Sequence, residues 1–329
     1  MAKLLEVKNL VTQFKVDKTK IISAVDNVSF SIDEGETLAI VGESGSGKSV
    51  TALSVMQLVP NPPGHIESGE IFFQGEDLLK KSAAQMREVR GNKISMIFQE
   101  PMTSLNPVYT IGQQITESIR LHLKVSKKEA EARAVELLRK VEIPDAEKRL
   151  KTYPHQLSGG MRQRVMICMA LSCSPKLLIA DEPTTALDVT IQAQILDLVR
   201  SLRESEKTAV MFITHDLGVV ADIAHRAAVM YAGNIMEMGS VHDMFLNPLH
   251  PYTRGLLSAI PRLSTPRGEK LYTIRGIVPD LSNLPQGCVF STRCEECMEI
   301  CHKQRPPLRQ LEDGRQVRCF KVEGGKVIG

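Results

Sequence analysis

The chain has 329 residues, of which 43% are hydrophobic, so it carries enough apolar side chains for a substantial buried core. Its 41 lysine and arginine residues nearly balance 38 acidic residues and form no basic blocks, which argues against nucleic acid as a partner. The N-terminus lacks the pattern of a secretory signal peptide, and no apolar run approaches the roughly 20 residues that a membrane-spanning helix needs. We therefore expect a globular protein of the cytosol, where clustered cysteines serve more often as metal ligands or catalytic thiols than in disulfides.

Apolar and polar residues alternate through the first 35 residues, with a polar turn between two runs, which predicts antiparallel strands. Four later runs are almost entirely apolar and end abruptly at a polar residue or a glycine: 37–42, 94–99, 176–182 and 209–215. Such runs are typical of a parallel sheet that is covered on both faces. Ligands bind beyond the carboxyl ends of the strands in such sheets, so we expect all four endings to converge on one site.

Three helical patterns lie between the predicted strands: from Lys48, from Ser158, and over residues 189–204. The segment 101–157 departs from this alternation and indicates a small helical insert, in which Ser126 and Glu129 have the spacing of a capping box. Beyond about residue 250 the sequence is proline-rich and irregular, which indicates a separate appendage.

A glycine-rich segment directly after the first apolar strand, GESGSGKS, fits the pattern G-x-x-x-x-G-K-[ST] of a phosphate-binding loop. Glycines let the backbone curl so that successive N–H groups face phosphate oxygens. In such a loop Lys48 reaches the β- and γ-phosphates, and the Ser49 hydroxyl ligates magnesium. The predicted nucleotide-binding residues of the loop are Gly42, Ser44, Gly45, Ser46, Gly47, Lys48 and Ser49. A plain glycine loop without a ligand fits the strand, loop and helix context less well.

Polar side chains end the other three apolar strands. Asp181 and Glu182 end one of them, where carboxylates are costly unless they bind something. Asp181 would hold magnesium through water, and Glu182 would orient or deprotonate an attacking water. His215 could donate to a γ-phosphate, and Gln99 ends its strand in the same way. Each has a simpler interpretation, as a helix-capping acid or a surface residue, but their shared position at strand ends favours a site.

A second glycine-containing segment, LSGGMRQR, begins a later helix. Ser158, Gly159 and Gly160 would present a hydroxyl and bare backbone N–H groups at the helix N-terminus, an arrangement that favours an anion. Two phosphate-binding helix starts, 110 residues apart, suggest two faces of a dimer that hold nucleotide between them.

These motifs together resemble those of the ATP-binding cassette (ABC) ATPases. The matching segments are GESGSGKS as the Walker A loop, Gln99 as the Q-loop, LSGGM as the signature, LLIADE as Walker B, residues 186–188 as the D-loop and His215 as the switch histidine. In that family each chain supplies half of each ATP site. Met161 departs from the usual signature glutamine, but the three signature residues that contact phosphate are retained.

The resemblance implies ATP and Mg²⁺ as cofactors. The residues it assigns are Ser49, Gln99 and Asp181 at the metal, Lys48, Gln99, Glu182 and His215 in catalysis, and Phe14 stacked on adenine, where a nearby Ile or Val could pack instead. It also implies an α/β fold, an ABC ATPase cassette with a P-loop, RecA-like parallel sheet, an N-terminal antiparallel β subdomain, an α-helical insert and a small C-terminal Cys-rich extension. We expect the nucleotide-binding core at residues 1–100 and 158–250, the helical signature subdomain at 101–157 and the extension at 251–329.

Three segments narrow the resemblance to the ATPase subunits of bacterial dipeptide and oligopeptide importers, of the dipeptide-type D subunit: QEPMTSLNP, LSGGMRQR and, at residues 250–261, HPYTRGLLSAIP. This implies a peripheral protein on the cytoplasmic face of the membrane that drives peptide uptake. Its partners would be a homologous ATP-binding subunit in a heterodimer, two transmembrane permease subunits and an extracytoplasmic peptide-binding protein. An importer of nickel or another small solute is an alternative. A soluble ABC ATPase acting on nucleic acid or ribosomes would need a long coiled-coil insert or two cassettes in one chain, and neither is present.

Five of the seven cysteines lie between residues 288 and 319, with the spacing C-x5-C-x2-C-x3-C-x17-C. This spacing lacks the paired knuckles typical of structural zinc, whereas a [4Fe-4S] cluster needs four thiolates and tolerates irregular spacing. We therefore expect an iron–sulfur cluster that pins the proline-rich tail, with zinc and free thiols as the alternatives. The resemblance to the peptide-importer ATPases assigns the ligands and leaves Cys297 spare: Cys288, Cys294, Cys301 and Cys319.

Overall fold

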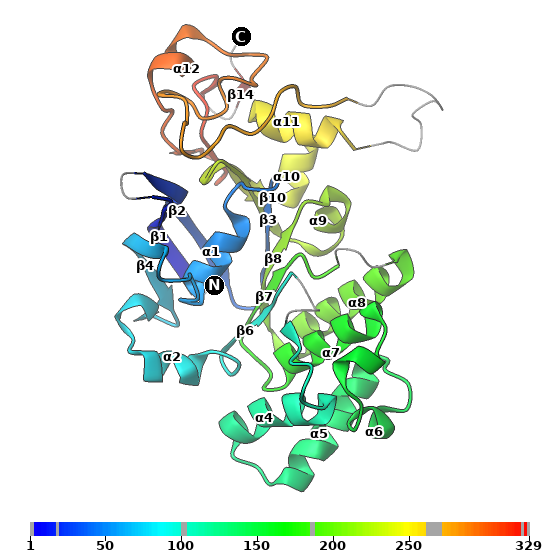
Figure 1. Cartoon of the computed structure of the whole chain (residues 1–329). Coiled ribbons are helices and arrows are strands. Elements are labelled where there is room, and N and C mark those ends of the chain that lie inside the picture. The colour runs from blue at the N-terminus through cyan, green and yellow to red at the C-terminus, as the bar shows by residue number, and fades with distance from the viewer. Residues whose placement is uncertain are drawn as a thin grey trace. The chain divides into compact units, whose positions relative to one another are not determined.

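A computed structural model of the chain describes residues 3–17, 20–99, 104–184, 188–260, 272–323 and 326–327 (Figure 1). The chain divides into two compact units, each assembled from segments that are distant in sequence. The first comprises Met1–Leu5, Ile32–Thr37 and Phe72–Ile213, and the second comprises Glu6–Ser31, Leu38–Ile71 and Thr214–Gly329. The predicted Walker A loop lies in the second unit, and the predicted Walker B and signature segments lie in the first.

Three short parallel strands form the centre of the first unit: β6 (Ile94–Ile97), β7 (Leu177–Asp181) and β8 (Ala209–Thr214). Strand β7 lies between the other two, with Ile94 opposite Leu177 and Leu177 opposite Ala209. Every residue of the three strands is buried, as expected where both faces of a parallel sheet are covered. The sequence-based prediction of these strands and of their parallel arrangement is confirmed.

Helices make up most of the rest of the first unit. They are η1 (Leu78–Lys80), α2 (Ala83–Val89), α4 (Ile111–Leu123), α5 (Lys127–Lys140), α6 (Ala146–Arg149), η2 (Pro154–Gln156), α7 (Gly159–Leu171) and α8 (Val189–Glu206). Figure 1 shows α4, α5 and α7 packed as a group. The predicted capping box is present: the Ser126 hydroxyl accepts from Glu129 N–H at 3.3 Å, and the Glu129 carboxylate accepts from Ser126 N–H at 2.8 Å. No helix of the described part of the chain is both long and apolar enough to cross a membrane.

The second unit contains a sheet that includes strands of the C-terminal segment. Strand β9 (Arg226–Tyr231) is parallel to β3 (Thr37–Val41) and antiparallel to β10 (Asn234–Ser240). Beyond β10 come β12 (Gln316–Val317) and β11 (Arg309–Gln310), each antiparallel to its neighbour. The C-terminal segment is therefore hydrogen-bonded to the edge of this sheet.

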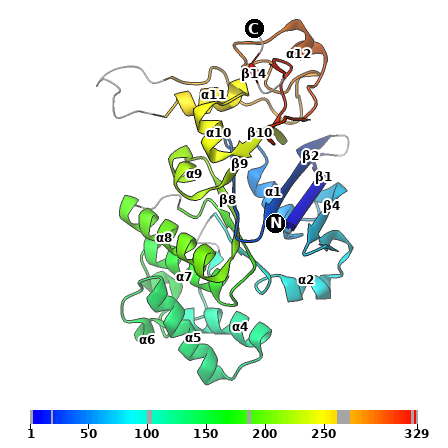
Figure 2. The ribbon, with the colours of Figure 1, turned by 180° about the vertical axis from the view of Figure 1, so that it is seen from behind.

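Further elements complete the second unit. They are α1 (Lys48–Val55), α9 (Leu217–Ile223), α10 (Val241–Leu246), α11 (Pro251–Ser258), α12 (Glu299–Lys303), β13 (Val322–Glu323) and β14 (Lys326–Val327). Figure 2 shows α10 and α11 beside β10. Most of a four-stranded sheet also belongs to this unit, in the order β2 (Ile21–Asp33), β1 (Lys3–Lys15), β4 (Gly64–Phe73) and β5 (Glu76–Asp77). Strands β1 and β2 confirm the strands predicted for the first 35 residues.

A buried carboxylate joins β10 to the start of α11. Glu237 is fully buried, and its two carboxylate oxygens accept from the backbone N–H groups of Leu249 and His250, each at 2.9 Å. His250 is also buried, and its Nδ1 accepts from Tyr252 N–H at 3.0 Å, which caps α11. The imidazole therefore acts as a neutral hydrogen-bond acceptor inside the fold.

We predict that His250 makes the folded chain sensitive to acid. Burial, followed by the nearby charge of Arg254, lowers the pKa of His250 to about 3, and Arg318 adds opposing smaller effects. The unfolded chain keeps a histidine pKa of about 6.5, so below that pH it binds a proton that the folded chain does not. This group alone should therefore reduce the free energy of unfolding by about 1.4 kcal/mol for each pH unit between about 6.5 and about 3.

His250→Asn tests this, because asparagine can cap α11 without titrating in that range. Denaturant unfolding at pH 7.5 and pH 5 should show that the stability advantage of the wild type over the variant shrinks by about 2 kcal/mol at the lower pH. Burial raises the pKa of Glu237, so that carboxyl has the opposite pH dependence, but it is present in both proteins. If the free energy of unfolding changed equally with pH in the two proteins, His250 would not be the source of the acid sensitivity.

Candidate functional site: a phosphate-binding loop and an ATPase half-site

The GESGSGKS segment forms a tight loop between β3 and α1 that requires glycine. Gly42, Gly45 and Gly47 have positive φ angles of 154°, 77° and 101°, which residues with side chains rarely adopt. A Cβ atom on Gly42 would lie 2.2 Å from the carbonyl oxygen of Met230, and one on Gly47 would lie 2.4 Å from that of Ala24. The loop is therefore closed against the backbone of β9 and β2, and α1 begins directly after it, as predicted.

Two polar side chains of this loop are buried. Lys48 is 5% exposed, and its Nζ donates to the carbonyl oxygens of Gly42 at 2.8 Å and Glu43 at 3.0 Å. Ser46 is 1% exposed, and its hydroxyl has no hydrogen-bond partner in the described part of the chain. A buried hydroxyl without a partner is costly, and a phosphate oxygen would supply one. The other predicted residues of the loop lie at its more exposed positions: Ser44, Gly45 and Ser49.

The loop also contains a charged residue whose role the motif does not predict. The Glu43 carboxylate pairs with Arg293, which stands among the C-terminal cysteines, and the Glu43 N–H donates to the Tyr252 hydroxyl. The pattern G-x-x-x-x-G-K-[ST] allows any residue at this position, so nothing in the motif indicates the contact.

The predicted Walker B carboxylates end β7 in the first unit. Asp181 is buried and lies opposite Ile213 on β8. Glu182 follows with a φ angle of 47°, a left-handed conformation that costs a residue with a side chain free energy. Its N–H donates to the Ile213 carbonyl oxygen at 2.9 Å, and its carboxylate accepts from Gln99 Nε2 at 3.4 Å. The first unit therefore brings Gln99 and Glu182 into contact.

The predicted signature residues begin α7. The Ser158 hydroxyl caps the helix by accepting from Met161 N–H at 3.4 Å. Gly159 and Gly160 border open space, because a Cβ atom on either would meet no heavy atom within 4 Å. The N-terminus of α7 therefore has room for a bound group beside its N–H groups.

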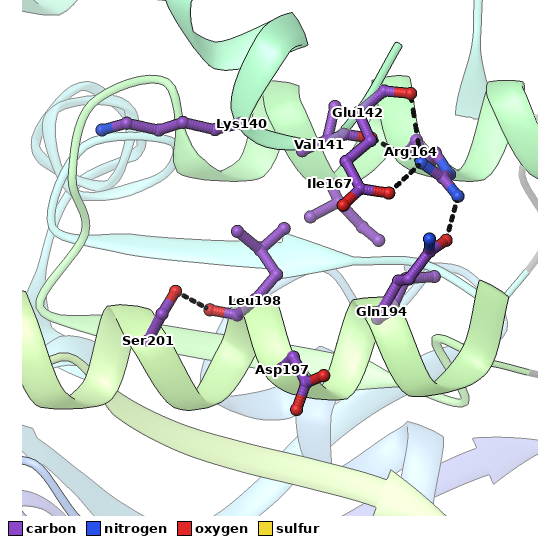
Figure 3. Close-up of a pocket in the computed structure, with 10 residues that line it drawn as sticks. Lys140, Val141, Glu142, Arg164, Ile167, Gln194, Asp197, Leu198 and Ser201 are labelled. Atoms are coloured by element: carbon purple, nitrogen blue, oxygen red, sulfur yellow. Dashed lines mark hydrogen bonds and ion pairs between the residues drawn. The ribbon is translucent and has the colours of Figure 1, made fainter. Parts of the chain in front are cut away.

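Two further side chains of α7 fix this helix to its surroundings. Gln163 is buried, and its Nε2 donates to the carbonyl oxygen of Pro183 at 2.6 Å, in the turn that follows β7. Arg164 donates to the carbonyl oxygen of Glu142 at 3.2 Å and to the side chain of Gln194 on α8, beside a pocket of about 260 Å³ (Figure 3). The signature motif predicts the start of the helix but not these anchoring contacts.

Two other predicted site residues have surroundings that the structure describes. Phe14 on β1 is half-buried, and a Cβ atom on Gly64 would lie 2.6 Å from its Cε1, so the ring lies against that glycine. His215 is exposed directly after β8, next to Asp216, whose carboxylate caps α9. Parts of the resemblance lie outside the described residues, namely 100–103, 186–187 in the predicted D-loop, and 261.

The prediction of an iron–sulfur cluster at the C-terminal cysteines is wrong. The described residues include all seven cysteines, and among them no group of three or more His, Cys, Asp or Glu side chains is arranged to hold a metal ion. The alternative of zinc is not supported for the same reason. All seven cysteines are free thiols.

The five C-terminal cysteines pack against apolar side chains. Four of them contact one apolar core of the second unit: Cys288, Cys294, Cys297 and Cys301. Cys319 instead packs against a second cluster that contains Val317. Burial raises the pKa of Cys288 to about 11 and that of Cys294 to about 12, so both are protonated thiols at neutral pH. The cysteine spacing counts possible ligands, but it carries no information about their burial.

Comparison with known proteins identifies the fold. The dimeric structure of the ATP-binding cassette MJ0796, in a post-hydrolysis state bound to ADP and phosphate, is 29% identical and has a TM-score of 0.66, over 72% of this chain and 98% of that chain. A family model described as "ABC transporter" matches residues 25–185. The fold is therefore that of an ABC ATPase cassette.

Similarity to sequence relatives extends over almost the whole chain. The oligopeptide transport ATP-binding protein AppD of Bacillus subtilis (strain 168) is 55% identical over 98% of both chains. OppD of the same organism, also named for oligopeptide transport, is 54% identical over 97% of this chain and 89% of its own, and the dipeptide transport protein DppD of Escherichia coli (strain K12) is 49% identical over 96% of both. A model described as "Oligopeptide/dipeptide transporter, C-terminal region" matches residues 236–301. The chain belongs to the ATP-binding proteins of ABC peptide transporters.

We predict that Gly47→Ala destabilises the chain more than Gly45→Ala. Both substitutions place a side chain at positive φ, at a cost of about 1 kcal/mol or more. Only Gly47 also has a backbone oxygen in the way, whereas a Cβ atom on Gly45 meets nothing within 4 Å. We expect losses in the free energy of unfolding of about 3 kcal/mol for Gly47→Ala and about 1 kcal/mol for Gly45→Ala. Denaturant unfolding without nucleotide measures both, and equal losses would mean that the loop is not closed against β2.

Proposed function

We propose that this chain binds and hydrolyses ATP to drive the uptake of di- or oligopeptides across the cell membrane. The phosphate-binding loop carries the proposal, because Lys48 is held inside it and the buried Ser46 hydroxyl lacks a partner. The names of the relatives support the cargo, since they refer to oligopeptide and dipeptide transport. An importer of nickel or another small solute, or an ATPase acting on nucleic acid or ribosomes, is not favoured by those names.

The chemistry of the side chains supports a role for each. Lys48 supplies positive charge to the β- and γ-phosphates, and Glu182 orients or deprotonates the attacking water with Gln99 in contact. Magnesium would neutralise phosphate charge when bound. The remaining assignments are Ser49, Gln99 and Asp181 at magnesium, His215 at the γ-phosphate, Phe14 at adenine, and Gly42, Ser44, Gly45, Ser46 and Gly47 around the phosphates.

The signature would complete the ATP site of a second, homologous chain. Ser158, Gly159 and Gly160 offer a hydroxyl and N–H groups beside open space, which suits phosphate oxygens from a partner's nucleotide. The dimeric state of the cassette MJ0796 supports this arrangement. ATP binding would then close the dimer, and hydrolysis would reopen it.

The proposed assembly is that of a membrane importer. The chain would lie on the cytoplasmic face as a peripheral subunit, in a heterodimer with a homologous ATPase, beneath two transmembrane permease subunits that receive peptide from an extracytoplasmic binding protein. Within the chain, residues 1–100 and 158–250 would form the nucleotide-binding core, 101–157 the helical signature subdomain and 251–329 a C-terminal extension. The match of residues 236–301 to the transporter C-terminal region supports such an extension.

We predict that two substitutions separate ATP binding from hydrolysis. In the assembled transporter, Lys48→Ala should abolish ATP-dependent peptide uptake because the phosphates lose their main positive contact. Glu182→Gln should retain ATP binding but lower the hydrolysis rate by about 100-fold or more, because the amide cannot accept a proton. Phosphate release and uptake of a labelled dipeptide measure both effects. Normal turnover by Glu182→Gln would remove Glu182 from the proposed role, and normal uptake by Lys48→Ala would remove the ATPase function.

We also predict that the isolated chain is a poor ATPase and that addition of the homologous ATP-binding subunit raises its rate, because its signature acts on nucleotide bound by another chain. Phosphate release measured with and without that subunit checks this. Ser158→Arg, which places a large side chain at the start of α7, should reduce the stimulation. High activity in a strictly monomeric sample would contradict the shared site.

A further inference from the structure

A partly buried ion pair joins the phosphate-binding loop to the C-terminal segment. The Arg293 side chain is only 4% exposed, and it donates from Nη1 to Glu43 Oε2 at 2.5 Å and from Nη2 to Glu43 Oε1 at 3.0 Å. Two parallel bonds of this kind are the most specific contact that an arginine makes with a carboxylate. The partners are 250 positions apart in the chain, so the pair is purely a product of the fold.

Other contacts fix the Arg293 guanidinium in place. Its Nε donates to the carbonyl oxygen of Arg275 at 3.0 Å, and its Nη1 lies 3.4 Å from the Tyr231 hydroxyl. The guanidinium carbon also lies 5.7 Å from the centre of the Tyr231 ring, within cation–π range. These contacts fix the orientation of the Arg293 guanidinium, so that its two Nη atoms face the Glu43 carboxylate.

Glu43 uses all of its polar groups, and it divides them between the C-terminal segment and the loop. Its carboxylate binds Arg293, and its N–H donates to the hydroxyl of the fully buried Tyr252 at 3.0 Å. Its carbonyl oxygen accepts from Lys48 Nζ at 3.0 Å and from Ser46 N–H at 3.2 Å. A shift of Glu43 would therefore move the carbonyl that holds the phosphate-binding lysine.

We propose that Arg293 and Tyr252 are positioning residues for ATP binding: they fix Glu43, and through it they hold the phosphate-binding loop and Lys48 in the conformation that accepts nucleotide. The proposal rests on the ATP-binding function proposed above. It makes the nucleotide affinity of the cassette depend on its C-terminal segment. A purely structural role for the ion pair, in which Arg293 only holds that segment in place, would leave nucleotide affinity unchanged.

The equilibrium dissociation constant of the full-length chain for Mg·ATP tests the proposal. Arg293→Met removes the charge and keeps an apolar stem, whereas Glu43→Gln removes the charge of the loop and preserves its shape. We expect each to raise the dissociation constant about 10-fold. Because the two substitutions remove the same ion pair, the double variant should bind Mg·ATP no more weakly than whichever single variant binds it less tightly. In the assembled transporter the KM for ATP should rise while kcat stays within about twofold.

Arg315→Met provides a matched control for loss of a buried arginine. Arg315 is 5% exposed in the same unit, and its hydrogen bonds go to Asp313 and to the carbonyl oxygen of Asn247 rather than to the loop. This variant should lower the melting temperature without changing the dissociation constant. Tyr252→Phe keeps the buried ring and removes only the acceptor of the Glu43 N–H, so it should weaken ATP binding about threefold.

The outcomes separate the proposal from the ATPase function. Failure of the wild type to bind Mg·ATP would overturn the ATPase function itself. The positioning role is refuted if Arg293→Met and Tyr252→Phe bind Mg·ATP as tightly as the wild type does. It is also refuted if the increases in dissociation constant caused by Arg293→Met and Glu43→Gln are additive in free energy. If Arg293→Met does not fold, Tyr252→Phe and Arg293→Lys decide the question. Arg293→Lys can make only one of the two bonds and should give an intermediate dissociation constant.

Discussion

The closure of neighbouring backbone around the phosphate-binding loop is the constraint on which the rest of the nucleotide site depends. The Ser46 carbonyl oxygen accepts from Gly233 N–H at 2.9 Å, and the Gly233 carbonyl oxygen accepts from Asp26 N–H at 2.8 Å. The loop is therefore tied through the turn between β9 and β10 to β2. Because backbone atoms occupy the space where Cβ atoms would be, the loop can be formed only from glycine at Gly42 and Gly47. The same closure places Lys48 in the interior, where its charge faces the loop carbonyls.

Strand pairing, aromatic packing and an ion pair hold the C-terminal segment in place. Strand β12 pairs with β10, with Val317 opposite Glu237. Tyr231, Tyr252 and Phe290 form a cluster whose ring centres lie 4.8–5.3 Å apart, and such contacts contribute about 0.5–1.5 kcal/mol for each pair. The two hydrogen bonds between Arg293 and the partly exposed Glu43 carboxylate add a further contact between this segment and the loop. Together these contacts connect the C-terminal segment to the sheet and to the loop of the second unit.

The limits of sequence-based prediction follow from the range over which each signal acts. The capping box at Ser126, the start of α1 and the buried strands are predictable because their determinants lie within a few residues of one another. Contact between Gln99 and Glu182 follows from one topological rule about strand ends. The pairing of Arg293 with Glu43 has no local determinant, because it requires the C-terminal segment to return to the loop. The cysteine prediction failed for a related reason: spacing identifies thiols that could bind metal, whereas the fold decides whether their side chains are arranged around one centre, and among the described residues they are not.

The strained conformation of Glu182 indicates how the first unit maintains its proposed catalytic carboxylate. A φ angle of 47° costs of order 1–3 kcal/mol for a residue with a side chain, so surrounding contacts must hold it. The Glu182 N–H is anchored on Ile213, and the next residue, Pro183, is held through its carbonyl oxygen by the buried Gln163. Gln163 lies in α7, the helix that begins with the signature. The turn that carries Glu182 is therefore tied by a buried hydrogen bond to the helix that begins with the predicted signature residues, within one unit.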